Sequence, residues 1–441
     1  MRPAFLALAL ITCVLDPSAA SAAEAASEDQ RIDALERRID ELERESEESG
    51  SRLADWTDHV ALSGSLNTGF YDAENAHPWN GDGFEVWDAR FFVDAEVGGP
   101  IQLFGHTIAR NAGMTFEWNL VRVGAVDPTG IGDLYIEVQR LAGSGWLSAQ
   151  LGRFQLPVGE GYLRYGKGYA HKPFISNAVS STWYWDEGLK LYGGDDTGFF
   201  SYVASITENE TLFNTSLDDQ LQYTLKLAVD PLSWLHLSVS GLYGGAVQIV
   251  PGSFMSGEGL WFGEMWLRQF GSYTGTPSYV DGVVTAPGPM RLGTSWLVGA
   301  DAIVTLPVGV DLWFSYSHYV SDQGSPTYDR TFENWIAEIV LHGRLVDPAL
   351  DVFYLGVRAN GLGTYDDARG YLLDTRSSQL GYNMSSLTDY SVVLGWKLIH
   401  GLTLRAEYTR RVIDLVDGTP AATHAMVDDM NAWAVELGVW F

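Results

Sequence analysis

The chain has 441 residues with a formal net charge of −29, from 56 acidic and 27 basic residues. Such an acidic chain argues against nucleic acid as a partner, because the phosphate backbone needs a surface of basic residues. Aromatic residues make up 13% of the chain, and glycines number 48. A soluble domain does not require so many, whereas aromatic girdles and tightly packed strands do.

The first residues have the layout of a secretory signal peptide. Arg2 gives a basic start, residues 4–15 form an apolar run, and small residues follow up to a cleavage pattern at Ala20-Ser21-Ala22. The run is too short for a transmembrane helix, which needs about 20 residues. We therefore predict a signal peptide over 1–22.

Cys13 is the only cysteine and lies inside this segment, so the exported chain is expected to have none. A disulfide framework and a cysteine metal site are therefore not expected. An alternative is that Cys13, preceded by Thr12, is a lipidation site.

The segment from 24 to 55 differs in composition from the rest of the chain. The stretch 27–48 is rich in charged residues, and its apolar residues are spaced three, four and three apart, as at the a and d positions of a heptad. These seam residues are Ile32, Leu35, Ile39 and Leu42. We predict a short helical coiled-coil arm over 24–55; a solvated tether is the alternative, since two heptads are marginal in water.

From residue 57 to the end, the apolar pattern has a period of two. In 220–227, for example, apolar residues alternate with polar ones at every position. Alternation predicts strands with one apolar and one polar face, as in a barrel or a sandwich. Most segments have about the ten residues that a tilted membrane strand needs. The predicted strands are 58–70, 86–98, 113–123, 133–141, 146–154, 186–193, 198–207, 220–229, 234–243, 294–305, 309–320, 333–344, 350–360, 389–398, 402–412 and 430–441.

The connections between these strands alternate between short turns and long loops, which is the asymmetry of a membrane barrel. The long loops are 71–85, 155–185, 244–293, 361–388 and 413–429. The segment 99–112 fits either the second turn or a longer strand. We therefore predict an all-β fold over 57–441, a sixteen-stranded antiparallel transmembrane β-barrel in which the last strand closes on the first.

The chain ends in Trp440-Phe441 on an alternating strand. A terminal aromatic residue is what barrel proteins present to the assembly machinery of the outer membrane, so Phe441 is the predicted assembly signal. An even number of strands returns both ends of the barrel to the periplasm, where the predicted arm would then lie.

Two motifs carry a resemblance to a known family. The stretches GRFQLPVGEG (152–161) and WDEGLKLYG (185–193) resemble the phosphate-selective porins of the O and P type, and the heptads resemble the N-terminal arm of that group. The chain departs from the group in having five lysines and an acidic excess. The resemblance implies a Gram-negative outer-membrane porin that is surrounded by lipid and lipopolysaccharide and assembles as a homo-oligomer, a trimer. The heptads of the arm favour a different number of chains, because isoleucine at a with leucine at d is typical of two-stranded coiled coils.

In sixteen-stranded porins the third external loop folds inward and narrows the pore. Here that loop is 155–185, and it places four basic side chains opposite a single carboxylate. The candidate constriction residues are Arg164, Lys167, His171, Lys172 and Glu160. A local positive charge in a poorly screened site predicts a modest preference for anions, despite the acidic total.

Alternation also predicts which charges face the lumen. The principal candidates are Arg90, Lys226, Arg344, Arg405, Glu117 and Glu137. The same pattern places further charges there: Asp94, Glu96, Asp311, Glu338, Arg358, Lys397, Glu407, Arg411 and Glu436. These charges either pair with one another to satisfy a polar lumen or stay unpaired and set ion preference.

No pattern of residues indicates an enzyme. The nine histidines are scattered, and neither the H-E-x-x-H nor the G-x-S-x-G motif occurs. No metal or cofactor is expected. Two function classes remain: passive diffusion of small hydrophilic solutes or ions, and a plugged barrel that serves as an anchor or as a receptor for a ligand such as a metal chelate. In the second case, the segment 244–293 is the candidate plug.

Overall fold

The computed structural model describes residues 59–73, 83–97, 100–103, 106–120, 131–161, 172–176, 185–208, 221–245, 261–262, 265–268, 279–280, 283–284, 294–322, 330–363, 371–375, 378–415 and 429–441. The predicted signal peptide (1–22) and arm (24–55) lie outside the described residues. The chain divides into two compact units, Met1–Val60 and Ala61–Phe441, and the fold below is that of the second.

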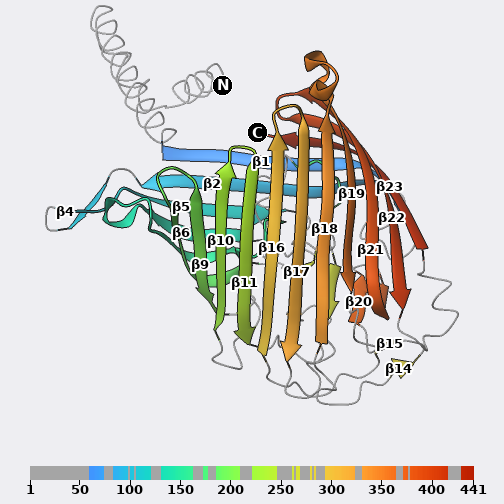
Figure 1. Ribbon diagram of the computed structural model, residues 1–441, viewed down its shortest axis with the longest axis horizontal. Coiled ribbons are helices and arrows are strands. Elements are labelled where there is room, and N and C mark those ends of the chain that lie inside the picture. Colours follow the sequence, from blue (N-terminus) through green and yellow to red (C-terminus); the bar gives the residue numbers. More distant parts are fainter. Residues whose placement is uncertain are drawn as a thin grey trace, which may run out of the picture. The chain divides into compact units, whose positions relative to one another are not determined.

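Sixteen strands form one closed antiparallel barrel, as the sequence predicts. Figure 1 shows several of them side by side, from β9 to β19. Their bounds are β1 Val60–Ala73, β2 Gly83–Val97, β5 Asn111–Asn119, β6 Ile131–Gln139, β7 Ser148–Gln155, β8 Trp185–Gly194, β9 Phe200–Thr207, β10 Gln222–Leu232, β11 Leu235–Gly245, β16 Thr294–Leu306, β17 Val310–Asp322, β18 Arg330–His342, β19 Phe353–Gly363, β21 Ser378–Ile399, β22 Leu402–Leu415 and β23 Asp429–Trp440.

Each of these strands pairs with its neighbours in the chain, and β23 closes on β1. The closing register pairs Ser65 with Trp440 and Ala73 with Ala432. The predicted closure of 430–441 on 58–70 is therefore confirmed. Closure leaves no unpaired edge, which a sheet inside a bilayer could not satisfy with water.

The alternation has its apolar side outward, as strand β10 illustrates. Gln222, Thr224 and Lys226 face inward and are buried, whereas Tyr223 and Leu225 are 44% and 49% exposed. A soluble sandwich has the opposite arrangement, with apolar side chains inside and polar ones outside. Outward apolar and inward polar faces are those of a transmembrane barrel.

Short turns join the strands at one end of the barrel, where Figure 1 shows β10 joined to β11 and β16 to β17. Gly309 and Gly401 adopt φ values of 100° and 82° in two of these turns, a conformation that favours glycine. Phe441 lies at the same end: its backbone exchanges two hydrogen bonds with Gly64, and the amide of Trp440 donates to the carbonyl of Gly401.

The turn after β18 corrects one sequence prediction. β18 ends at His342, and Arg344 lies in the 3₁₀ turn η5 (Gly343–Leu345), followed by η6 (Pro348–Leu350). There the guanidinium of Arg344 forms an ion pair with Asp351 at 3.2 Å. Alternation placed Arg344 on the lumen wall because the predicted strand continued two residues too far.

None of the helices in the described ranges is long and apolar enough to span a membrane.

The remaining short strands fall where the sequence predicted irregular connections. The ambiguous segment 99–112 contains a small hairpin, β3 (Ile101–Leu103) with β4 (His106–Ala109), in a separate two-stranded sheet.

Two predicted long loops also contain strands. Within 244–293 lie β12 (Trp261–Phe262), β13 (Met265–Arg268), β14 (Tyr279–Val280) and β15 (Val283–Val284). The predicted loop 361–388 is wrong in part, because β20 (Tyr371–Thr375) lies within it and β21 begins at Ser378. β20 pairs with both β13 and β21, so the sheet extends beyond the barrel ladder at the loop end.

Candidate functional site

Two described parts of the predicted inner loop, 155–185, lie inside the barrel. The root segment (residues 156–161) follows directly after β7. The anchor segment (residues 172–176) lies farther along, where it contacts inward side chains of β19 and β22. Together these segments determine how the loop is held in the lumen.

The root segment is fixed to the wall at Gly159. The amide of Gly159 donates to Oγ of Ser240 on β11 at 2.9 Å, and its carbonyl accepts from Nζ of Lys226 on β10 at 3.2 Å. Gly159 has a φ of 68°, where an L side chain would be strained, so the glycine of the PVGEG stretch permits this bend. The neighbouring Val158 is 2% exposed and packs inward.

Glu160 is the predicted acidic residue of the constriction, and it is 1% exposed. Its Oε1 forms ion pairs with Nζ of Lys226 at 2.5 Å and with Nε2 of His236 at 2.8 Å. Burial by itself would raise the pKa of Glu160. The positive charge of Lys226 and the hydrogen bonds from Lys226 and His236 outweigh burial and hold this pKa below its ordinary value. Glu160 is therefore a charged, paired carboxylate.

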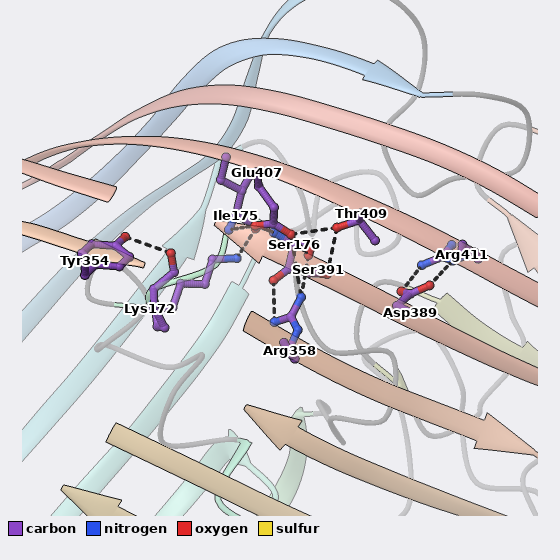
Figure 2. A network of polar contacts seen from close by, with 11 residues as sticks. Lys172, Ile175, Ser176, Tyr354, Arg358, Asp389, Ser391, Glu407, Thr409 and Arg411 are labelled. Atoms are coloured by element: carbon purple, nitrogen blue, oxygen red, sulfur yellow. Dashed lines mark hydrogen bonds and ion pairs between the residues drawn. The ribbon is translucent and has the colours of Figure 1, made fainter. Parts of the chain in front are cut away.

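The backbone of the anchor segment is bound to the part of the barrel wall formed by β19 and β22 (Figure 2). The amides of Ile175 and Ser176 donate to Oε2 of Glu407 at 2.5 and 3.2 Å. Arg358 donates to the carbonyl of Ser176 at 3.1 Å and to its hydroxyl at 2.5 Å. Because main-chain groups make most of these contacts, they fix the path of the loop rather than one side chain.

Phe174 gives the anchor segment its apolar attachment. It is 1% exposed, packs with Tyr354 and Val393, and lies with its ring centroid 4.4 Å from the guanidinium carbon of Arg358. A Cβ placed at Gly356 would lie 2.9 Å from the Phe174 ring, so only glycine leaves room for it there.

Tyr354 depends on a second glycine in the same way. A Cβ at Gly395 would lie 2.0 Å from the ring of Tyr354, whose hydroxyl donates to the carbonyl of Pro173 at 2.9 Å. Gly356 and Gly395 therefore shape the part of the wall that receives the anchor segment.

The loop contacts opposite sides of the barrel. The next anchor residue, Ile175, packs against Tyr71 on β1 and against Ala432 and Ala434 on β23. In the order of the sheet, β22 lies seven strands along from β10, which is nearly half of the sixteen. The root and anchor contacts thus place the loop across the lumen.

The structure places Lys172 differently from the sequence prediction. Its side chain is 7% exposed and its ammonium donates to the carbonyl of Ile175 at 2.6 Å, while its own carbonyl accepts from Arg405 at 2.7 Å. Lys172 is thus part of the anchor and does not extend freely into the lumen. The other three predicted constriction residues, Arg164, Lys167 and His171, lie outside the described residues.

The predicted lumen charges are extensively paired. Arg90 forms an ion pair with Asp88 and, at 3.2 Å, with Glu117. Glu137 accepts hydrogen bonds from Gln139, Gln150 and Tyr192. Two further pairs, from β22 to its neighbours, are Arg405 with Glu436 and Arg411 with Asp389. Of the two alternatives from the sequence, mutual pairing holds for Arg90, Arg405 and Arg411, whereas Glu137 is hydrogen-bonded by neutral side chains.

Sequence reasoning placed Glu407 and Arg358 on the lumen wall but missed their partners. Nothing in the sequence marked Ile175 and Ser176 as those partners, since they lie 232 and 231 positions from Glu407. A usable signal was the glycine in the strand 350–360: Gly356 lies inward between Tyr354 and Arg358, where a glycine admits a close neighbour.

Among the described residues, no group of three or more histidine, aspartate or glutamate side chains could hold a metal ion. What the site provides is a charged, hydrogen-bonded lumen crossed by a loop.

The sequence matches no family model and no curated protein. Solved structures with a similar fold include the outer-membrane protein OmpT of Vibrio cholerae, at 13% identity and a TM-score of 0.53 over 87% of this chain and 97% of that one. The outer-membrane channel DcaP of Acinetobacter baumannii has a TM-score of 0.53 at 10% identity, again over 87% and 97%. OprB of Pseudomonas putida has a TM-score of 0.51 at 12% identity, over 89% and 97%.

The chain has the fold of these barrel proteins. At such low identities the likeness extends to the fold alone and assigns no solute to the lumen.

Proposed function

We propose that the chain is a porin, a passive diffusion channel for small hydrophilic solutes or ions in the outer membrane of a Gram-negative bacterium. The observation that carries the proposal is a closed sixteen-stranded barrel with a charged lumen and an inner loop fixed at both sides of it. A water-filled lumen lined by charges is how such barrels conduct. The barrel fold shared with the outer-membrane channel DcaP supports the same location.

We propose that loop 155–185 forms the constriction and that it favours anions modestly. Glu160 is the only acidic residue between Arg153 and Asp186. Since it pairs with Lys226, it does not cancel the charges of Arg164 and Lys167 farther along the loop. A small unbalanced charge in a narrow, low-dielectric site acts more strongly on a passing ion than distant surface charges do.

The solute class proposed here is broader than phosphate. The resemblance of the two loop motifs to phosphate-selective porins supports the porin class. The chain has only five lysines, too few to line the pore with a row of basic side chains that would bind phosphate. We further propose a homo-oligomer, a trimer with the arm over 24–55 in the periplasm, surrounded by lipid and lipopolysaccharide.

Single-channel recording in a planar bilayer tests the proposal. The purified protein should give discrete conductance steps, with a reversal potential across a salt gradient that favours chloride over potassium. Changing Arg164 and Lys167 to glutamine together should remove that preference. An insertion-competent, folded barrel without conductance would contradict the channel and favour the plugged receptor or anchor. Conductance with a potassium preference would contradict only the anion selectivity.

A further inference from the structure

His236 lies at the base of the root segment, near the start of β11, between two carboxylates. Its Nε2 is 2.8 Å from Oε1 of Glu160 in the inner loop. Its Nδ1 is 2.9 Å from Oδ1 of Asp230 on β10. The two ring nitrogens therefore connect the loop to the wall strand beside it.

The two contacts of His236 determine how many protons its ring must carry. An ionised carboxylate only accepts hydrogen bonds, and a neutral imidazole has a single N–H to donate. With a neutral ring, one nitrogen lone pair would face a carboxylate oxygen at hydrogen-bond distance, which is repulsive. With an imidazolium, both nitrogens donate and both contacts are charge-assisted.

The second proton could instead reside on a carboxyl group, but the surroundings disfavour this for Glu160. Lys226 lies 2.5 Å from the same Oε1 and holds the pKa of Glu160 below its ordinary value, after the opposing effect of burial. Asp230 is 44% exposed and so keeps much of its hydration as an anion. The ring is the group that remains to carry the proton.

The charged groups around the ring come from three elements. Glu160 belongs to the inner loop and Asp230 and Lys226 to β10. Asp301, on β16, pairs in register with Ser238 and interacts electrostatically with Glu160 and Lys226. When His236 is protonated, two positive charges face these three carboxylates. When His236 is neutral, only the charge of Lys226 balances these carboxylates, and the net charge at the base of the constriction becomes more negative by one unit.

We propose that His236 is a specificity-determining residue of the channel: as an imidazolium it ties the root segment to β10 and supplies a positive charge beside the constriction. Loss of that proton makes the lumen more favourable to cations and loosens the root segment. This inference rests on the proposed channel for its consequence, while the charge of the ring itself does not depend on transport.

The first test therefore measures the ring and not the current. With ¹⁵N-histidine labelling of the full barrel in detergent, the His236 signals, assigned by their loss in His236→Gln, should report two protonated nitrogens at pH 7. Asp230→Asn removes one of the two anionic acceptors and should move the titration of His236 to lower pH. A neutral, single-tautomer ring at pH 7 in the wild type would overturn the proposal, whether or not the protein conducts.

The second test measures reversal potentials in a salt gradient from pH 5 to pH 9. The wild type should shift toward cation preference as pH rises, and His236→Gln should lose that shift. His342→Gln is the matched control, since His342 contacts one carboxylate, Asp311, at 2.8 Å and should leave the shift in place. The variant His171→Gln tests the other titratable group of the loop. A shift that persists in His236→Gln and disappears in His171→Gln would overturn the assignment to His236.

Discussion

Replacing Phe174 with alanine should release the anchor segment while leaving the barrel folded. Phe174 is 1% exposed, lies over Gly356 and stacks on the guanidinium of Arg358, but it belongs to a loop and not to the strand ladder. The sixteen strands keep their backbone pairing without it. The cost should therefore appear as loop detachment and not as unfolding.

The magnitude follows from its surroundings. Full burial of a phenylalanine contributes about 1.5–3 kcal/mol, and a desolvated cation–π contact adds about 2 kcal/mol. Their sum agrees with the cost of about 3–5 kcal/mol for removing a buried aromatic ring. Since 1.4 kcal/mol is a factor of ten, the ratio of docked to undocked loop should fall by a factor on the order of 10² to 10³.

Single-channel recording in planar bilayers is the assay. Phe174→Ala should raise the mean conductance or the open-channel noise, because the loop no longer holds a fixed position across the lumen. The control is Phe353→Ala, on the same strand as Gly356 but on the outward face, where Phe353 stacks on Trp396 with ring centroids 5.5 Å apart. Conductance and noise identical in wild type and Phe174→Ala would refute the anchoring role, provided that both barrels show the same heat-modifiable migration on gels.

Four further predictions address other parts of the chain. Deleting Phe441, whose side chain is 71% exposed, should lower the amount of barrel in outer-membrane fractions far more than it lowers stability; equal amounts would contradict its role in assembly. Gly395→Val should displace the ring of Tyr354 and cost about 1–3 kcal/mol in loop docking, read as the same rise in channel noise. The pKa of Glu160 is lower in the folded protein than in the unfolded chain, where it is about 4.3, so its ion pairs stabilise loop docking above about pH 4.3 and this contribution is lost as the pH falls through the folded-state pKa. Acid should therefore increase the channel noise of the wild type more than that of Glu160→Gln. Changing the four seam residues of the arm to serine should lower the heat resistance of the oligomer on gels, and an unchanged oligomer would leave the arm as a tether.

The sequence by itself determined the barrel. Alternation is a local property with a period of two, so each strand could be recognised without knowledge of its partners, and short turns fixed the order of pairing. The weak points were those where alternation is interrupted or ends: the hairpin at 101–109, the early start of β21 and the turn that holds Arg344. At such places the backbone follows hydrogen bonds that the side-chain pattern does not record.

Only the tertiary structure decided the pairing inside the lumen. Inward direction could be predicted for Glu407 and Lys226, but their partners, Ser176 and Glu160, come from a loop that is remote in sequence. Which charges meet there depends on the stagger of the closed sheet and on the path of the loop across it, and neither quantity is encoded in the period of any one strand. The path of the loop also makes Lys172 part of the loop's attachment and not a free pore charge, because its ammonium donates to the carbonyl of Ile175 in its own segment.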